Sequence, residues 1–286
     1  MKLPFLPFHE SSSFFDFVHE TTQADGRGKA GVGIPGAAMP GSGARVPDSV
    51  GNEGLTGGGL SVPMATTVLA LRFDGGVLIA GDRRATEGFQ IADRRIQKVF
   101  AIDTHSAMAI AGAAGPCMEM AKLLQTELEH YEKIEGEELS CEGKANKLGQ
   151  MVKANLPMVF QGLVVMPIFS GYDLARKEGR IFKYDLTGGR YEELDYYAIG
   201  SGGKDARSTM REHYQRGLSS EQALSLALLS LYNAAEDDVG TGGPDVVRGI
   251  YPTAKIITEA GIAAVEGSRI KRLYADMIAV RTRSDE

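Results

Sequence analysis

Two adjacent threonines, Thr66 and Thr67, begin the apolar run TTVLALRF, after sixty-five residues of a different character. A threonine hydroxyl is a weak nucleophile unless a base lies beside it, and a threonine at a chain terminus carries its own base, the α-amine. That amine titrates near about pH 8, and a nearby ammonium raises its unprotonated fraction at neutral pH. Cleavage of the Ala65–Thr66 bond would therefore create a nucleophile, and residues 1–65 would be a propeptide.

Two charged residues lie inside apolar runs that are typical of strands. Alternation in VLIAGDRR places Asp82 on the face of its apolar neighbours, and alternation in RRIQKVF places Lys98 between Ile96 and Phe100. Such a lysine lies either at a sheet edge or inside, where an unpaired ammonium is costly. Asp82 is a plausible partner for an inward Lys98. Taken alone, the two charges fit a purely structural ion pair at least as well.

The sequence has no pattern typical of a metal site, a catalytic triad or a phosphate-binding loop. The five histidines lack metal-ligand spacing and fit a solvated surface, and no catalytic triad has a good candidate. The glycine clusters at 200–203 and 241–245 do not match phosphate-binding loops and fit tight turns. Cys117 and Cys141 fall in predicted helices, where buried free thiols are expected. We expect neither a cofactor nor a metal.

Composition narrows the class of protein. The chain has 286 residues, a net charge of -6, 43% hydrophobic and 24% charged residues, as in ordinary soluble proteins. The negative charge argues against a nucleic-acid partner. No run approaches the roughly 18 apolar residues of a membrane helix, and prolines and acids interrupt the N-terminal apolar stretch. These features favour a cytoplasmic location with no membrane partner.

The chain divides near residue 65. Residues 26–59 are rich in glycine without periodicity, which predicts a flexible leader. Beyond it, apolar patterns predict strands and helices in the order strands, two helices, strands, two helices, strands. Consecutive hairpins imply antiparallel sheets, so we expect an α+β fold, a four-layer α-β-β-α sandwich. The expected strands are 66–73, 76–82, 94–103, 107–112, 163–173, 179–186, 196–203, 250–261 and 261–267; the expected helices are 115–134, 141–161, 203–215, 219–235 and one from about 268.

The motifs TTVLAL, AGDRRAT, QKVF, AGAAG, IGSGG and DDVGTGGPD resemble those of 20S proteasome β-subunits, above all the actinobacterial type. The likeness covers essentially all of 66–286, in the right order and spacing. It implies a threonine protease with the N-terminal nucleophile hydrolase fold, hydrolysing peptide bonds without ATP. It also implies stacked seven-membered rings with α-subunits and other β-subunits, and a regulatory ATPase ring that feeds unfolded protein.

The resemblance also assigns roles to residues. Thr66 matches the nucleophile, Asp82 and Lys98 the pair that tunes it, and Gly112 the oxyanion donor. Three further positions match groups near the nucleophile: Ser201, Asp238 and Thr241. Thr86 and Ala114 match positions that bind the substrate backbone as an added strand. The pocket for the residue before the cleaved bond would be apolar, lined by Ala85, Ile96, Phe100, Ile110, Ala114 and Met118.

Three positions depart from the family pattern. Ala65 stands where glycine is usual before the nucleophile, which predicts slower processing or a need for assembly. Val239 replaces a small polar residue, and Thr241 replaces serine while keeping the hydroxyl. The alternatives are a simpler two-ring, HslV-type threonine protease and a non-catalytic α-type ring subunit. The long leader and TGGPD argue against the first. The complete set of Thr66, Asp82, Lys98 and Gly112 argues against the second.

Overall fold

The computed structural model describes residues 66–87 and 90–284, with side chains for 66–87 and 90–279. The predicted propeptide, with its boundary at Ala65, lies outside the described residues. Two five-stranded sheets form the centre of the described part, and all neighbouring strands in them are antiparallel. The first sheet has the order β10-β1-β2-β11-β12, with β10 (Tyr196–Gly200), β1 (Thr67–Phe73), β2 (Gly76–Gly81), β11 (Thr253–Thr258) and β12 (Gly261–Ala264). The second has the order β5-β6-β7-β8-β9, with β5 (Val99–Ala101), β6 (Ser106–Gly112), β7 (Val165–Asp173), β8 (Glu178–Tyr184) and β9 (Arg190–Glu193).

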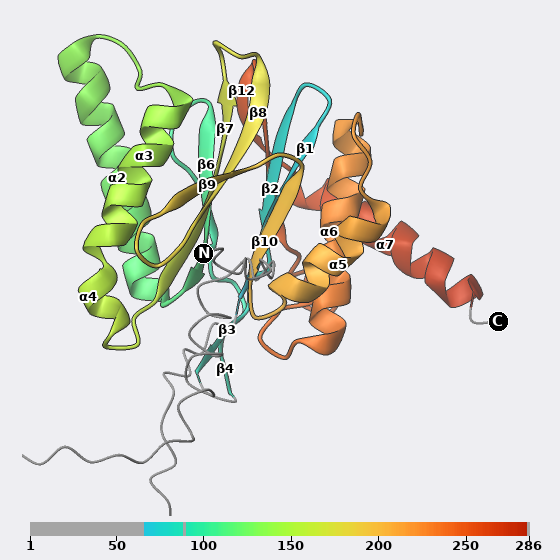
Figure 1. Ribbon diagram of the computed structural model, residues 1–286. Helices are drawn as coiled ribbons and strands as arrows, with labels where there is room; N and C mark the ends of the chain where they lie inside the picture. The colour runs from blue at the N-terminus through green and yellow to red at the C-terminus, as the bar shows by residue number, and fades with distance from the viewer. Residues whose placement is uncertain (1–65, 88–89, 285–286) are drawn as a thin grey trace, which may run out of the picture. The chain divides into compact units, whose positions relative to one another are not determined.

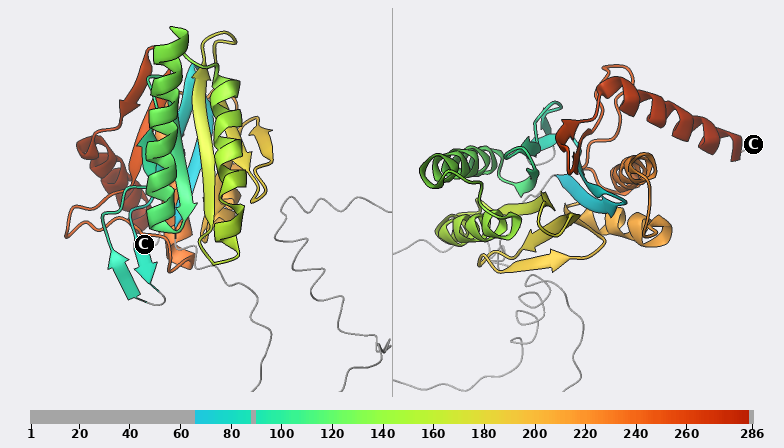
Figure 2. Two further views of the ribbon diagram at one scale, coloured as in Figure 1. Left: turned by 90° about the vertical axis from the view of Figure 1, so that its left-hand side faces the viewer. Right: turned by 90° about the horizontal axis from the view of Figure 1, so that it is seen from above.

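Helices cover the outer faces of the two sheets (Figure 1). The second sheet is covered by α2 (Ala114–Glu135) and α3 (Cys141–Ala154), and the first by α5 (Gly203–His213) and α6 (Ser220–Asp237). The view from above shows the helix pairs on opposite sides of the sheets, with α7 (Gly267–Ser284) extending outward (Figure 2). The four-layer α-β-β-α sandwich expected from the element order is thus confirmed.

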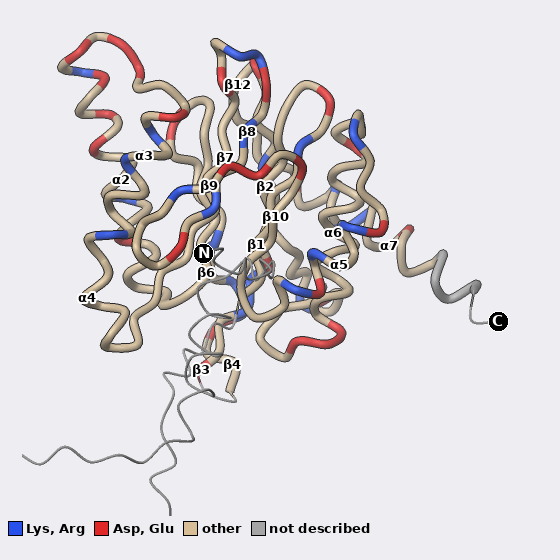
Figure 3. Tube along the Cα trace, in the orientation of Figure 1, with Lys and Arg blue, Asp and Glu red and all other residues tan. Residues whose placement is uncertain are grey.

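Strands β1 and β2 are buried on both faces. Leu69 and Leu71 pack towards α5 and α6, while Val68 and Ala70 pack between the sheets. Burial on both sides explains why these strands appear in the sequence as continuous apolar runs. Charged residues of both signs follow the helices and loops around this interior (Figure 3). The rare charged groups inside it therefore need a specific explanation.

Local signals placed most of these elements correctly. The Asp74–Gly75 turn joins β1 to β2, and Ser219 forms a capping box with Gln222 at the start of α6. Cys117 and Cys141 are buried free thiols, as expected. Helical spacing predicts that Tyr131 shares the buried face of α2 with Leu124 and Leu128, but Tyr131 is 36% exposed. The core side of α2 ends one turn earlier, at Leu128.

The sequence patterns also misplaced several elements. The strand expected over 94–103 spans only Val99–Ala101, and residues 85–93 instead form a small hairpin of β3 (Ala85–Glu87) and β4 (Gln90–Asp93). Every residue of β4 is exposed, so no apolar alternation marked it. The polar strand β9 was missed for the same reason. The helix expected over 141–161 stops at Ala154 and resumes as the single turn α4 (Leu156–Val159), because Pro157 lacks the amide hydrogen that a continuous helix requires.

Within the described residues, no helix combines the length and the apolar character needed to cross a membrane.

Candidate active site

Thr66 lies where the end of β10 meets the start of β1. Its carbonyl oxygen accepts a hydrogen bond from the Ser201 amide at 2.9 Å, and Thr67 pairs with Gly200 across the two strands. Gly200 has φ +102°, and a Cβ built there would stand 1.8 Å from the Thr66 carbonyl oxygen. Only glycine allows this close approach. The IGSGG turn therefore fixes the backbone at residue 66.

Asp82 and Lys98 form a buried ion pair beside this strand end. Asp82 directly follows β2 and Lys98 directly precedes β5, and their side chains are 0% and 4% exposed. The Lys98 Nζ to Asp82 Oδ1 distance is 2.6 Å. The inward orientation and the predicted counter-charge are therefore present, although the strand alternation used to infer them does not extend back to Ile96.

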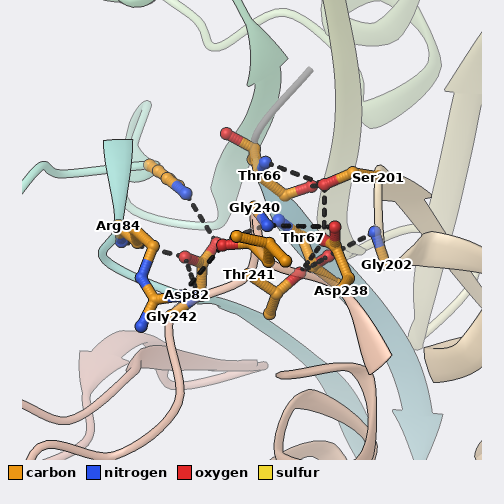
Figure 4. Close-up of polar contacts among 12 residues, drawn as sticks. Thr66, Thr67, Asp82, Arg84, Ser201, Gly202, Asp238, Gly240, Thr241 and Gly242 are labelled. Carbon is orange, nitrogen blue, oxygen red and sulfur yellow. Dashed lines mark hydrogen bonds and ion pairs between the residues drawn. The ribbon is translucent and has the colours of Figure 1, made fainter. Parts of the chain in front are cut away.

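The Asp82 carboxylate is also held by backbone amides. Oδ1 accepts a hydrogen bond from the Thr67 amide at 2.9 Å, and Oδ2 accepts from the amides of Arg84 at 2.9 Å and Gly242 at 2.8 Å. The Arg84 guanidinium in turn donates to the Val239 carbonyl at 2.9 Å. A buried carboxylate satisfied in this way has a fixed orientation. It joins β1, the β2 end and the 238–242 loop at one point (Figure 4).

Burial lowers the pKa of Lys98, and the neighbouring Asp82 offsets this effect only in part. The ammonium therefore gives up its proton more readily than an exposed lysine does. The backbone carbonyl of Lys98 accepts a hydrogen bond from the Ile110 amide at 3.0 Å, which ties the lysine to β6. One oxygen of Asp82 therefore links the Lys98 ammonium to the Thr67 amide.

A second polar cluster surrounds the Thr66 nitrogen (Figure 4). The Thr66 amide donates to Ser201 Oγ at 3.3 Å, and Ser201 Oγ donates to Asp238 Oδ2 at 2.5 Å. Thr241 Oγ1 donates to the same Asp238 oxygen at 2.5 Å, and Asp238 Oδ1 accepts from the Gly240 amide at 3.0 Å. All three residues assigned by resemblance around the nucleophile therefore lie together. They form one hydrogen-bonded path to the nitrogen of residue 66.

Thr67 belongs to this cluster, although strand alternation assigned it no role. Its side chain is fully buried. Thr67 Oγ1 lies 2.6 Å from Thr241 Oγ1 and accepts a hydrogen bond from the Gly202 amide at 3.0 Å. A polar residue at the head of an apolar strand was the available signal, but β-propensity explains a threonine there equally well.

Gly112 ends β6 beside the Lys98 segment. It pairs with Val165 on β7 and has φ +127°. A Cβ at this position would stand 2.0 Å from the Val164 carbonyl oxygen, so no other residue fits this strand end. Its N–H is the candidate oxyanion donor.

The predicted substrate-binding residues come from separate segments. Ala85 and Thr86 begin β3, and Ala114 begins α2. Ile110 and Phe100 pack in the same apolar cluster under α2, which also contains Cys117 and Met120. The other pocket residues are more open: Ile96 and Ala85 are half-buried, Ala114 is exposed, and Met118 is 41% exposed. The structure brings Ile110 and Phe100 into contact with one core and leaves Met118 facing outward.

Across the described part of the chain, no group of three His, Cys, Asp or Glu side chains could hold a metal ion.

Comparison with known proteins gives a consistent family. A family model described as proteasome subunit matches residues 62–248. A protein of Acidimicrobium ferrooxidans named proteasome subunit beta is 54% identical over 226 residues, which cover 79% of this chain and 83% of the relative. One of the same name from Streptomyces griseus is 53% identical over 218 residues, covering 75% and 78%. The chain therefore belongs to the proteasome subunit family, and its likeness is to the β-subunits of the bacterial 20S proteasome.

Proposed function

We propose that this chain is a catalytic proteasome β-subunit whose nucleophile is the hydroxyl of Thr66, exposed by cleavage of the Ala65–Thr66 bond. The observation that carries the proposal is the setting of the residue-66 nitrogen. It lies 3.3 Å from Ser201 Oγ, at the end of a hydrogen-bonded path to Asp238. The buried Asp82–Lys98 pair is bonded to the next residue in the chain. Groups suited to positioning an amine and groups suited to tuning it therefore meet at two adjacent residues, Thr66 and Thr67.

The proposed reaction is acyl transfer. The Thr66 hydroxyl attacks the peptide carbonyl and gives its proton to its own α-amine, directly or through a water. The Gly112 N–H stabilises the oxyanion, a type of contact that typically contributes 10²–10³-fold in rate. The protonated amine then gives the proton to the leaving nitrogen, and a water molecule hydrolyses the ester to release the acyl group. The positive charge of Lys98, held by Asp82, favours the unprotonated amine.

The same hydroxyl would remove the leader. In the uncleaved chain the residue-66 nitrogen is an amide and has no basicity, so residues 1–65 keep the subunit inactive. We propose self-cleavage at this bond. Ala65 supports slow processing, because alanine tolerates a strained turn less well than glycine does.

Family membership supports the wider setting of this activity. We propose that the subunit assembles with α-subunits, and with any other β-subunits, in stacked rings in the cytoplasm. A regulatory ATPase ring would deliver unfolded protein through the α-ring, while hydrolysis itself needs no ATP. The relatives named proteasome subunit beta support this assembly over the two-ring alternative.

The test compares the full chain with Thr66→Ala and Thr66→Ser, each assembled with α-subunits. Intact-mass measurement follows the leader, and a fluorogenic peptide with an apolar residue before the cleaved bond follows hydrolysis. Wild type should yield a subunit that starts at Thr66, and Thr66→Ala should neither lose the leader there nor hydrolyse the peptide. Thr66→Ser should retain both activities in reduced form. Complete processing of Thr66→Ala would refute the scheme.

A further inference from the structure

We propose that Thr67 is a positioning residue for the nucleophile, acting through its buried hydroxyl. This inference rests on the proposed function of Thr66. The hydroxyl contacts no part of the reacting bond and works through Thr241 and Asp238.

The hydrogen bonds around Thr67 have one possible direction. Thr241 has a single hydroxyl hydrogen, which it donates to Asp238 Oδ2 at 2.5 Å. In the 2.6 Å contact between the two threonine hydroxyls, Thr67 must therefore be the donor. Thr67 Oγ1 in turn accepts from the Gly202 amide at 3.0 Å. The chain runs from the Gly202 amide through both hydroxyls to a carboxylate, and hydrogen bonds aligned in this way strengthen one another.

The same set of hydrogen bonds extends through Asp238 and Ser201 to the nitrogen of residue 66. Ser201 Oγ donates its hydrogen to the same Asp238 oxygen at 2.5 Å. Its lone pairs are then left to accept from the Thr66 nitrogen, which lies 3.3 Å away. The position of Asp238 Oδ2 therefore fixes both the Thr241 hydroxyl and the serine that faces the nitrogen. Thr67 holds that arrangement through its contact with Thr241.

The Thr67 backbone reaches the other half of the site. Its amide donates to Asp82 Oδ1 at 2.9 Å, the same oxygen that pairs with Lys98 Nζ at 2.6 Å. One residue thus links the ion pair to the hydroxyl chain, and it is covalently bonded to the nucleophile. A small displacement at Thr67 would move Thr66 relative to both clusters.

The glycine at position 202 leaves space for the hydroxyls of Thr67 and Thr241. Gly202 begins the turn into α5, and a Cβ added there would stand 2.6 Å from Thr241 Oγ1 and 2.7 Å from Thr67 Oγ1. Those distances are too short for any side chain at 202. The absence of a side chain at Gly202 therefore leaves room for the hydroxyl pair, independently of the hydrogen bonds themselves.

Two near-isosteric substitutions separate the hydroxyl from the shape of the side chain. Thr67→Val keeps the volume and removes the hydroxyl, while Thr67→Ser keeps the hydroxyl and removes a methyl group. In the full chain assembled with α-subunits, Thr67→Val should slow leader removal by about 10-fold or more, because the buried Gly202 amide and the Thr241 hydroxyl lose their partner. Per processed subunit, it should lower kcat for a fluorogenic peptide by a similar factor at unchanged KM. Thr67→Ser should stay within about 3-fold of wild type.

A double-mutant cycle gives the second arm. Thr241→Val removes the other member of the hydroxyl pair, so the double variant Thr67→Val/Thr241→Val should be no slower than the worse single variant. If Thr67→Val does not fold, as judged by thermal unfolding, Thr67→Ala takes its place, because Thr67→Ala and Thr67→Ser differ only by the hydroxyl. Multiplicative losses in the double variant, or a Thr67→Val protein that processes and hydrolyses like Thr67→Ser, would overturn the inference. An inactive wild type that keeps its leader would instead refute the proposed function of Thr66.

Discussion

Lys98 and Lys144 are buried to nearly the same extent, 4% and 5% exposed, in different parts of the molecule. Lys98 has one acidic partner, Asp82, and burial lowers its pKa despite that partner. Lys144, on α3, forms ion pairs with Asp103 at 2.8 Å and Glu138 at 2.9 Å. Burial lowers its pKa too, but the two carboxylates outweigh burial and the net shift is upward.

The difference separates a structural ion pair from one suited to chemistry. Two carboxylates pair with the single charge of Lys144, so this lysine stays protonated. Its contribution is to hold α3 against the loop before β6. At Lys98 the single carboxylate of Asp82 offsets the effect of burial only in part, so the pKa of this lysine stays lowered. A lysine of lowered pKa is suited to a role in chemistry. Perturbed groups of this kind cluster at functional sites, and the contrast within one chain strengthens that interpretation.

The largest predicted effect comes from removing each lysine in turn. Lys98→Met should reduce peptide hydrolysis and leader removal by about 10²–10³-fold, a loss typical of a removed electrostatic contact. It should also lower the free energy of unfolding by about 3 kcal/mol, because the Asp82 carboxylate remains buried without its cation. Lys144→Met should leave hydrolysis unchanged and lower the free energy of unfolding by about 1–3 kcal/mol, since Glu138 can reach solvent but the buried Asp103 Oδ2 loses its cation. Peptidase kinetics and chemical denaturation measure the two quantities.

Arginine variants provide the matched control for this pair of lysines. Lys144→Arg should leave hydrolysis at the wild-type level, because Lys144 makes no contact with the site and a guanidinium can pair with both of its carboxylates. Lys98→Arg should remain strongly impaired, since a guanidinium is larger and does not release its proton. Equal losses of hydrolysis at the two positions would remove the functional distinction.

The pH dependence of stability gives an intermediate effect of opposite sign at the two sites. The pKa of Lys98 is below its ordinary value of 10.5 in the folded chain, so the unfolded chain binds more protons and this site contributes more stability as pH rises towards 10.5. The pKa of Lys144 is above that value, so its contribution is complete below pH 10.5 and is lost above it.

Thermal unfolding between pH 7.5 and about pH 11 tests these signs. The midpoint of wild type minus that of Asp82→Asn/Lys98→Met should grow with pH, because the folded chain binds fewer protons at Lys98 than the unfolded chain does. Replacing both partners leaves no unpaired buried charge in the variant. The midpoint of wild type minus that of Lys144→Met should stay level and then fall. Parallel curves would show that the two lysines are equivalent.

The smallest effect concerns the thiols that lie near these lysines. Burial raises the pKa of Cys117 and of Cys141 to about 12, with Lys98 and Arg180 only partly opposing it. Neither thiol should therefore react with iodoacetamide in the folded protein at pH 8, while both should react after unfolding. Fast labelling of Cys117 alone, read by mass spectrometry, would mean that the Lys98 side is open in solution.

The sequence predicts those features that produce a local pattern of charges, apolar residues or turn residues. Charges that interrupt apolar runs predict the Asp82–Lys98 pair, and an Asp-Gly sequence between two apolar runs predicts the turn at Asp74–Gly75. The Thr67–Thr241 contact joins residues 174 positions apart and leaves no periodic signal. The roles of Ser201 and Asp238 came from resemblance to a family, since serine and acidic residues in loops have many ordinary explanations. The exposed β4 strand was missed because periodicity detects burial.

The hydrogen bonds at the start of β1 also affect the mobility of the chain end that cleavage before Thr66 would create. The first residues of a domain usually fray unless something ties them down. Here the contacts of the Thr66 carbonyl, the Thr67 amide and the Thr67 hydroxyl all come from residues beyond the bond at 65. A chain beginning at Thr66 would keep every one of them. Removing the leader would thus produce an anchored terminus, with the amine already in place when it forms.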